Sequence, residues 1–206
     1  MNNPPVIEAI NTFTFNKSKK NILVLIHGLF GNSGYWLPFL SFFSEFKILI
    51  LDINYEKIFT ENHARNDLNE FFELIMEGQE NCILLSHSIG TVLAKTCPEK
   101  KVKISYEICP IRNSVSTNKN HFIGEIMSLT SYSKEEIERI LEEATTFLSS
   151  NMDIKTASIN RKRYVPRIDT FFNDFGEYGD EYFDGDHFDI INAITMIKKD
   201  LSVVMR

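Results

Sequence analysis

The chain of 206 residues has few cysteines, no long apolar run and no excess of basic residues. Its three cysteines, Cys82, Cys97 and Cys109, form no CxxC pair, and their odd number fits a reducing compartment rather than a disulfide-stapled scaffold. The longest apolar runs, such as 22–26 and 48–51, are far shorter than the roughly 18 residues of a membrane span. A formal net charge of −6 argues against a broad nucleic-acid-binding surface.

We expect no secretory signal, because the N-terminus MNNPP lacks a basic stretch followed by an apolar one. We therefore expect a cytoplasmic protein with no membrane or nucleic-acid partner and an oligomeric state that the sequence leaves open. Apolar residues make up 43% of the chain, enough to bury a core without metal or disulfide staples. The length suits one domain, 1–206, at about 150 residues per domain.

Apolar runs and helical patterns alternate along the first half of the chain. Continuous apolar segments are typical of strands that are buried on both faces of a parallel sheet. Strands are expected at 12–15, 22–26, 47–52, 82–85 and 102–108. Helices are expected at 33–46, 63–77 and 91–97. This alternation predicts an α/β fold with a mostly parallel sheet that is flanked by helices.

The pattern changes between about residues 111 and 163. The clear element there is a helix from Lys134 to Leu148. Ser133 and Glu136 form a capping box at its N-terminus. A weak, polar, strand-like run covers 153–159. Strands at 163–172 and 181–183 and a helix from about Phe188 return to the sheet pattern, so 111–163 is predicted to be a helical insertion.

A serine stands between a predicted buried strand and a short helix, in the sequence SHSIG at 86–90. This setting is that of a nucleophile elbow, in which a tight turn presents the hydroxyl of Ser88 above the sheet edge. Such a turn needs small residues two positions before and two after the serine, and Ser86 and Gly90 occupy those positions. The same pattern also fits an ordinary polar turn between a strand and a helix.

Glycines follow the first buried strand in the sequence HGLFG at 27–31. The backbone amide of Leu29 is predicted to pair with that of Ile89, directly after the serine, as an oxyanion hole. We interpret His27 as a structural hydrogen-bonding residue, because it ends a buried strand.

A histidine follows the last predicted strand in the sequence GDHF at 185–188. Functional groups of an α/β sheet come from loops at the carboxyl ends of its strands, so His187 is expected at the same edge as Ser88. There it would accept the serine proton and return it to the leaving group.

These motifs, HGLFGNSGYW at 27–36, SHSIG at 86–90 and GDHF at 185–188, resemble the α/β-hydrolase family over nearly the whole chain. The resemblance implies a cap formed by the insertion and the order nucleophile, acid, histidine. It is nearest to compact cytoplasmic carboxylesterases and thioesterases, including the carrier-protein methyl-ester esterases of biotin synthesis and a related enzyme of menaquinone synthesis. The GDHF segment is similar to the end of type II thioesterases.

The acid of the triad is the least defined of its members. Asp174, at the end of the strand-like run, is the first choice, and Asp180 is the second. Asp169 lies within the predicted strand. Glu107 is a further candidate for the acid, and a Ser–His dyad without an acid is the last alternative.

The predicted activity is hydrolysis of a carboxylic ester or acyl thioester through an acyl-enzyme, with no metal or organic cofactor. Candidate substrate-binding residues are Phe30, Trp36, Ile140 and Phe147. The basic residues at 161–163 and Arg167 are either a solvated loop or a site for the phosphate of a phosphopantetheine or an acyl carrier protein. A lyase that uses the same triad and an inactive binding protein remain alternatives, because a fold does not fix a reaction.

Overall fold

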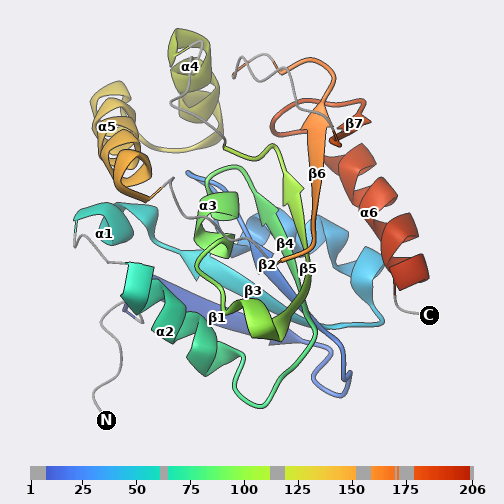
Figure 1. The fold of residues 1–206 in the computed structure, drawn as a ribbon. Coiled ribbons are helices and arrows are strands. Elements are labelled where there is room, and N and C mark those ends of the chain that lie inside the picture. Colours follow the sequence, from blue (N-terminus) through green and yellow to red (C-terminus); the bar gives the residue numbers. More distant parts are fainter. Residues whose placement is uncertain are drawn as a thin grey trace.

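The computed structural model describes residues 8–60, 65–111, 119–151, 159–169, 171 and 179–204. Its strands form one seven-stranded sheet in the order β1-β3-β2-β4-β5-β6-β7 (Figure 1). β1 pairs antiparallel with β3, and the other neighbouring strands are parallel. The strands are β1 (Ile10–Phe15), β2 (Ile22–Ile26), β3 (Lys47–Ile53), β4 (Cys82–His87), β5 (Val102–Ile108), β6 (Arg161–Pro166) and β7 (Glu181–Phe183).

The central strands are buried on both faces, as their continuous apolar runs predict. In β2 every residue is buried, and successive side chains alternate between two apolar layers. Val24 and Ile26 belong to one layer, and Leu23 and Leu25 belong to the other. The fold class predicted from the sequence is confirmed.

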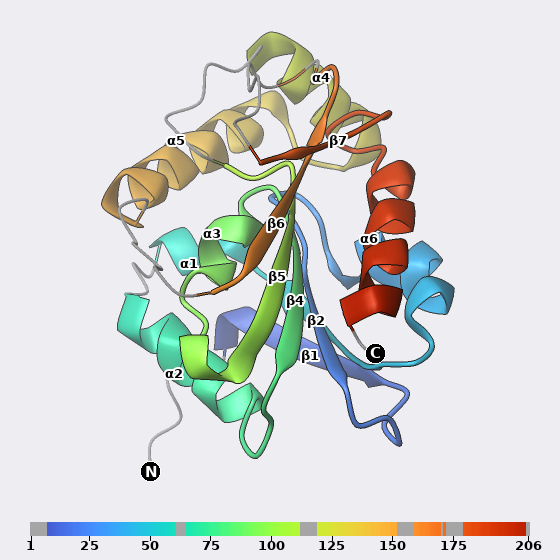
Figure 2. The same ribbon diagram turned by 45° about the vertical axis from the view of Figure 1, so that its right-hand side comes forward.

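Helices cover both faces of the sheet. One layer contains side chains of α1 (Tyr55–Thr60), α2 (Arg65–Ile75), α3 (Gly90–Ala94) and α5 (Lys134–Asn151), and the other contains side chains of the 3₁₀ helix η2 (Ser33–Phe43) and of α6 (Ile191–Val204). Figure 2 shows these layers on opposite sides of the sheet, with α4 (Lys119–Leu129) beyond the carboxyl ends of the central strands. None of the helices in these described ranges has the length and apolar character needed to cross a bilayer.

Two helices in the insertion lie close to the sheet edge that carries the predicted site. α4 and α5 pack against each other, and α5 also packs against α1. The predicted capping box of α5 is present, since the Ser133 amide donates to Glu136 Oε2 (2.7 Å) and the Glu136 amide donates to Ser133 Oγ (3.2 Å). Hydrogen bonds to the carboxylate from Ser133, first of all from its backbone amide, lower the pKa of the Glu136 carboxyl.

Several boundaries differ from the sequence-based expectation. The segment 33–46 was expected to be an ordinary helix, but it is the 3₁₀ helix η2, and Pro38 within it has no amide to donate. Helices α1 and α4 were not expected, and α2 ends at Ile75 instead of at residue 77. The strand expected at 163–172 is β6, which ends at Pro166 because its partner β7 has only three residues. Residues 152–158, in the weak strand-like run, lie outside the described ranges.

Candidate active site

Ser88 lies in the sharp turn between β4 and α3, as the sequence predicts. Its φ is 53°, a left-handed conformation that costs a residue with a side chain about 1–3 kcal/mol. Hydrogen bonds hold this turn. The Ser88 amide donates to the Ile108 carbonyl (2.9 Å), and the Ser88 carbonyl accepts from the Thr91 amide (3.0 Å) and hydroxyl (2.7 Å). The turn therefore has the geometry of a nucleophile elbow.

Two glycines allow the chain after β2 to lie against the elbow that carries Ser88. A Cβ on Gly90 would lie 2.6 Å from the carbonyl oxygen of His27, so α3 could not approach the end of β2 with any larger residue there. A Cβ on Gly28 would lie 3.0 Å from Ser88 Cβ and 2.9 Å from His87 Nδ1. The backbone after β2 therefore lies directly against the elbow.

Ser86 replaces the glycine that the resembled family has two positions before the nucleophile. Its side chain is fully buried, and its hydroxyl donates to the Tyr106 carbonyl (3.3 Å) of the neighbouring strand. The serine is thus accommodated by a hydrogen bond inside the sheet, while the left-handed turn is made at Ser88 itself.

A histidine and a carboxylate extend from Ser88 in a line of two hydrogen bonds. His187 Nε2 lies 3.0 Å from Ser88 Oγ, and His187 Nδ1 lies 3.2 Å from Asp169 Oδ2. An ionised carboxylate only accepts hydrogen bonds, so Nδ1 carries the proton and Nε2 is free to accept from the serine hydroxyl. The side chains of His187 and Asp169 are only 2% and 4% exposed, which keeps water from competing for these contacts.

Asp169 reaches this position because the chain turns after β6. Its other oxygen, Oδ1, accepts a hydrogen bond from the Phe171 amide (2.9 Å), which fixes the orientation of the carboxylate. The sequence placed Asp169 inside a strand, but β6 ends three residues earlier, at Pro166. Asp174, the acid favoured from the sequence, lies outside the described residues.

The other carboxylates weighed from the sequence contact arginines. Asp180 Oδ1 lies 3.0 Å from Arg163 Nε, and Glu107 Oε1 lies 3.4 Å from Arg161 Nε. Within the described ranges, Asp169 is the carboxylate that contacts the ring of His187.

Two backbone amides flank the elbow where an oxyanion would develop. Leu29 and Ile89 belong to the turns that Gly28 and Gly90 bring together, and Phe30 has a φ of 62° that turns the backbone after Leu29. Within the described part of the chain, neither amide donates to an acceptor. Unpaired amides next to a nucleophile are the donors that an oxyanion hole requires.

His27 has the structural role that the sequence suggests. Its Nε2 accepts from the Ile53 amide (2.9 Å), its Nδ1–H donates to the Gly28 carbonyl (2.8 Å), and its own carbonyl accepts from the Tyr55 hydroxyl (2.5 Å). Burial is the main cause that lowers the pKa of His27, so the ring stays neutral and supports the loop that carries Leu29.

Aromatic side chains surround His187. Its ring meets Phe188 edge-on, with 5.3 Å between the ring centroids, and Phe171 at 6.4 Å. Phe122 of α4 contacts both of these phenylalanines, at 6.1 and 6.0 Å, and lies 6.2 Å from Phe30. Because α4 was missed from the sequence, Phe122 was missed too, although Phe122 and Ile126 have helical spacing.

Of the four predicted substrate-binding residues, Trp36 lies apart from the other three. Phe30 packs against the aromatic residues near His187 and also against the layer that contains Ile140 and Phe147. Trp36 is fully buried in the layer of η2 and α6. Ile140 and Phe147 of α5 lie in the opposite layer, where Phe147 contacts Phe59 of α1 at 5.2 Å.

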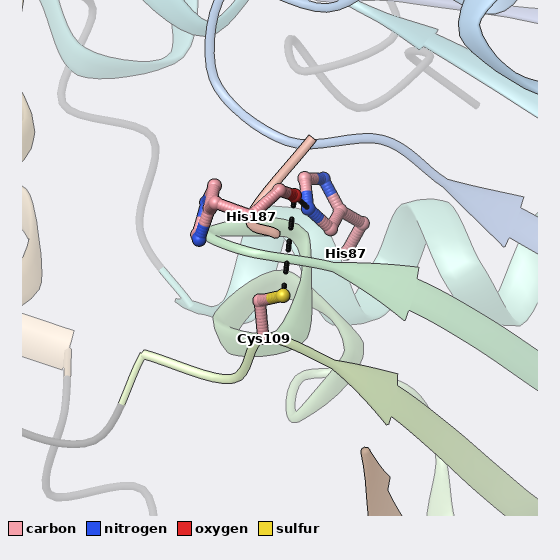
Figure 3. Close-up of side chains that lie close together, drawn as sticks. All are labelled: His87, Cys109 and His187. Carbon is pink, nitrogen blue, oxygen red and sulfur yellow. Dashed lines mark hydrogen bonds between the residues drawn. The ribbon is translucent and has the colours of Figure 1, made fainter. Parts of the chain in front are cut away.

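A second histidine and a cysteine gather beside His187. The ligand-type atoms of His87, Cys109 and His187 lie within 4.8 Å of one another. Figure 3 shows that the backbone carbonyl of His187 points between the His87 ring and the Cys109 sulfur. His87 Nε2 lies 2.8 Å and Cys109 Sγ 3.9 Å from that oxygen, so the space between the three residues holds a hydrogen-bonded carbonyl.

The basic residues at 161–163 and Arg167 are not a cluster of unpaired charge. Arg161 and Arg163 contact Glu107 and Asp180 on one side of β6, and Lys162 contacts Asp200 on the other. Arg167 Nε lies 3.0 Å from Asp184 Oδ1. Each cation therefore has a carboxylate partner.

No protein-family model matches the chain, and no curated protein matches its sequence. Solved structures do match. A mutant of the N-acyl homoserine lactonase AidH, complexed with N-hexanoyl homoserine lactone, has a TM-score of 0.68 at 12% identity, covering 96% of this chain and 93% of that chain. Carboxylesterase CesB from Bacillus subtilis has a TM-score of 0.61 at 12% identity, covering 95% and 87%. The NocB thioesterase domain has a TM-score of 0.64 at 13% identity, covering 93% and 99%.

These likenesses extend over nearly the full length of each chain, and they agree with the strand order and the elbow described above. The chain has the α/β-hydrolase fold.

Proposed function

We propose that the protein is a serine hydrolase that cleaves a carboxylic ester or an acyl thioester through an acyl-enzyme. Ser88 Oγ attacks the carbonyl carbon while His187 Nε2 takes the hydroxyl proton. The bond to the leaving group then breaks, and the same proton passes from Nε2 to the departing oxygen or sulfur. A water molecule, deprotonated by His187, releases the acid and restores Ser88.

One observation carries this proposal. The Ser88 hydroxyl, on a residue held at a φ of 53°, lies 3.0 Å from a histidine nitrogen whose partner nitrogen lies 3.2 Å from a buried carboxylate. A structural serine at a strand end needs neither the left-handed backbone nor this ordered pair of contacts. In the proposed triad, Asp169 takes the role that the sequence assigned to Asp174.

The amides of Leu29 and Ile89 would donate to the oxyanion that forms during acylation. Loss of one such donor costs about 10²–10³-fold in turnover in a well-studied serine protease. The two amides come from different loops, so the hole depends on the close approach that Gly28 and Gly90 allow.

We propose a small-molecule ester with an apolar acyl group as the substrate. The aromatic side chains next to His187 support an apolar acyl site, and three of the similar structures are named as esterase, thioesterase domain and lactonase. An acyl carrier protein is a weaker candidate, because the basic residues expected to receive it are each paired with a carboxylate.

A fluorophosphonate probe tests the nucleophile directly. The wild-type protein should be labelled, with the modified peptide containing Ser88, and Ser88→Ala should abolish labelling. Ser86→Ala is the matched control, since Ser86 is buried two residues away and its hydroxyl donates to a backbone carbonyl. Absence of labelling in the wild-type protein would instead support the inactive binding protein.

A panel of p-nitrophenyl esters and acyl thioesters of graded length then defines the reaction. Hydrolysis of these substrates supports the proposed function, and Ser88→Ala should leave at most the roughly 10³–10⁴-fold rate over water that binding and an oxyanion hole supply. Labelling at Ser88 without hydrolysis of any member would favour the lyase.

A further inference from the structure

The carbonyl oxygen of His187 connects the histidine loop to the residue next to the nucleophile. His87 Nε2 lies 2.8 Å from this oxygen, across a sequence separation of 100 residues (Figure 3). Cys109 Sγ, at the end of β5, lies 3.9 Å from the same atom. Other backbone contacts of the loop are local, such as those from the Asp186 amide to the Asp189 carbonyl (3.3 Å) and from the His187 amide to the Asp186 carboxylate.

The chemistry of the contact defines the form of the His87 ring. A carbonyl oxygen only accepts hydrogen bonds, so His87 must donate through Nε2–H and carry a lone pair on Nδ1. His87 is 2% exposed, and burial is the largest cause that lowers its pKa well below the ordinary value. The ring therefore stays neutral, and Nε2 keeps its proton while His187 cycles between its neutral and charged forms.

The rest of the His87 ring is also enclosed. It stacks on Tyr35, with 5.1 Å between the centroids and 24° between the planes. Its Nδ1 has no hydrogen-bond partner in the described part of the chain and faces Gly28, whose added Cβ would lie 2.9 Å away. The ring thus touches the turn that carries Leu29, the elbow of Ser88 and the loop of His187.

We propose that His87 is a positioning residue, whose Nε2–H holds the backbone of His187 at the distance that places its ring on Ser88. The inference rests on the proposed function. A shift of the His187 carbonyl would displace Nε2 from the serine hydroxyl, and a misplacement of about 1 Å costs on the order of 10²-fold in rate.

Two amide variants separate positioning from packing. The glutamine nitrogen of His87→Gln can occupy the place of Nε2 and keep the donor, whereas the shorter side chain of His87→Asn reaches only the place of Nδ1. We expect His87→Asn to lower kcat and the rate of fluorophosphonate labelling by about 10²-fold with little change in KM, and His87→Gln to retain activity within about tenfold. Cys109→Ala, which removes the weaker donor, should have the smaller effect.

Wild-type rates of labelling by His87→Asn would overturn the proposal, and so would equal losses in His87→Asn and His87→Gln. If His87→Asn fails to fold, ¹⁵N-histidine NMR of the wild-type protein decides: a proton on His87 Nε2 supports the contact, and a proton on Nδ1 overturns it. A wild-type protein that neither labels nor hydrolyses esters would refute the proposed function, whereas the NMR result would still report on the contact.

Discussion

Replacing Asp169 by asparagine should reverse the proton arrangement of the proposed triad. Asp169 Oδ1 accepts from the Phe171 amide (2.9 Å), and Oδ2 faces His187 Nδ1 (3.2 Å). In Asp169→Asn the amide oxygen must keep the Phe171 contact, so the NH₂ group would face Nδ1. Nδ1 would then have to accept, the imidazole proton would move to Nε2, and His187 could no longer take the proton of Ser88.

The size of the loss follows from that change of tautomer. In a well-studied serine protease the equivalent replacement lowers kcat by about 10⁴-fold, which corresponds to roughly 5.5 kcal/mol of transition-state stabilisation. Because the side chain of Asp169 is only 4% exposed, water is poorly placed to substitute for its charge. We expect at least about 10²-fold in kcat, with little change in KM or in melting temperature.

The assay is steady-state hydrolysis of the best p-nitrophenyl ester, with three matched variants. Asp184→Asn is the control, because this carboxylate is 84% exposed and pairs with Arg167. Asp174→Asn and Asp180→Asn test the acids that the sequence favoured. Retention of activity within about tenfold in Asp169→Asn would refute the tautomer argument, and a large loss in Asp174→Asn alone would return the role to that residue.

Three further predictions address the elbow, the acyl site and the buried histidines. Gly90→Ala should lower the free energy of unfolding, measured with denaturant, by more than about 1–3 kcal/mol, because its Cβ would lie 2.6 Å from a backbone oxygen. Gly124→Ala is the control and should be neutral or stabilising, because nothing lies within 4 Å of its added Cβ. Equal effects of the two substitutions would contradict the packing argument. In the wild-type protein, kcat/KM should rise with acyl-chain length by about 0.8 kcal/mol of transition-state stabilisation per methylene, and Phe122→Ala should reduce this rise. Met127→Ala, at an exposed position on the same helix, should leave it unchanged. If kcat/KM rises as steeply in Phe122→Ala as in the wild-type protein, α4 does not line the acyl site. The melting temperature should fall as the pH drops below the ordinary histidine pKa of 6.5, because the unfolded chain then binds protons that the buried rings of His27 and His87 do not bind. The fall should be shallower in His87→Gln. An unchanged slope in that variant would show that His87 does not cause the pH dependence.

The sheet and the pair Ser88–His187 could be anticipated from the sequence because each depends on a local signal. Continuous apolar runs define strands such as 22–26 and 82–85, and the end of a parallel strand fixes the edge on which a following residue appears. Ser88 directly follows such a strand, and His187 lies four residues after the short strand β7, so both are expected at the same edge of the sheet.

The acid and the aromatic surroundings depend on tertiary structure instead. The apolar pattern at 163–172 continues past Pro166, but pairing stops there because β7 is short, and this places Asp169 in a turn rather than in a strand. Helix α4 has a weak pattern of its own and is defined by packing against α5 and Phe171. Contacts between distant segments therefore decide which aromatic residues surround His187. Composition alone could not show that Phe122, and not Trp36, lies near the proposed site.

Trapping the acyl-enzyme with a true substrate is the most direct measurement of the central claim. A rapidly quenched reaction with a p-nitrophenyl ester should give protein whose intact mass is raised by one acyl group, with the modification on the peptide that contains Ser88. The same mixture with Ser88→Ala should give no adduct and no burst of p-nitrophenol. Steady ester turnover with the acyl group on another residue, or turnover that persists in Ser88→Ala, would contradict the account.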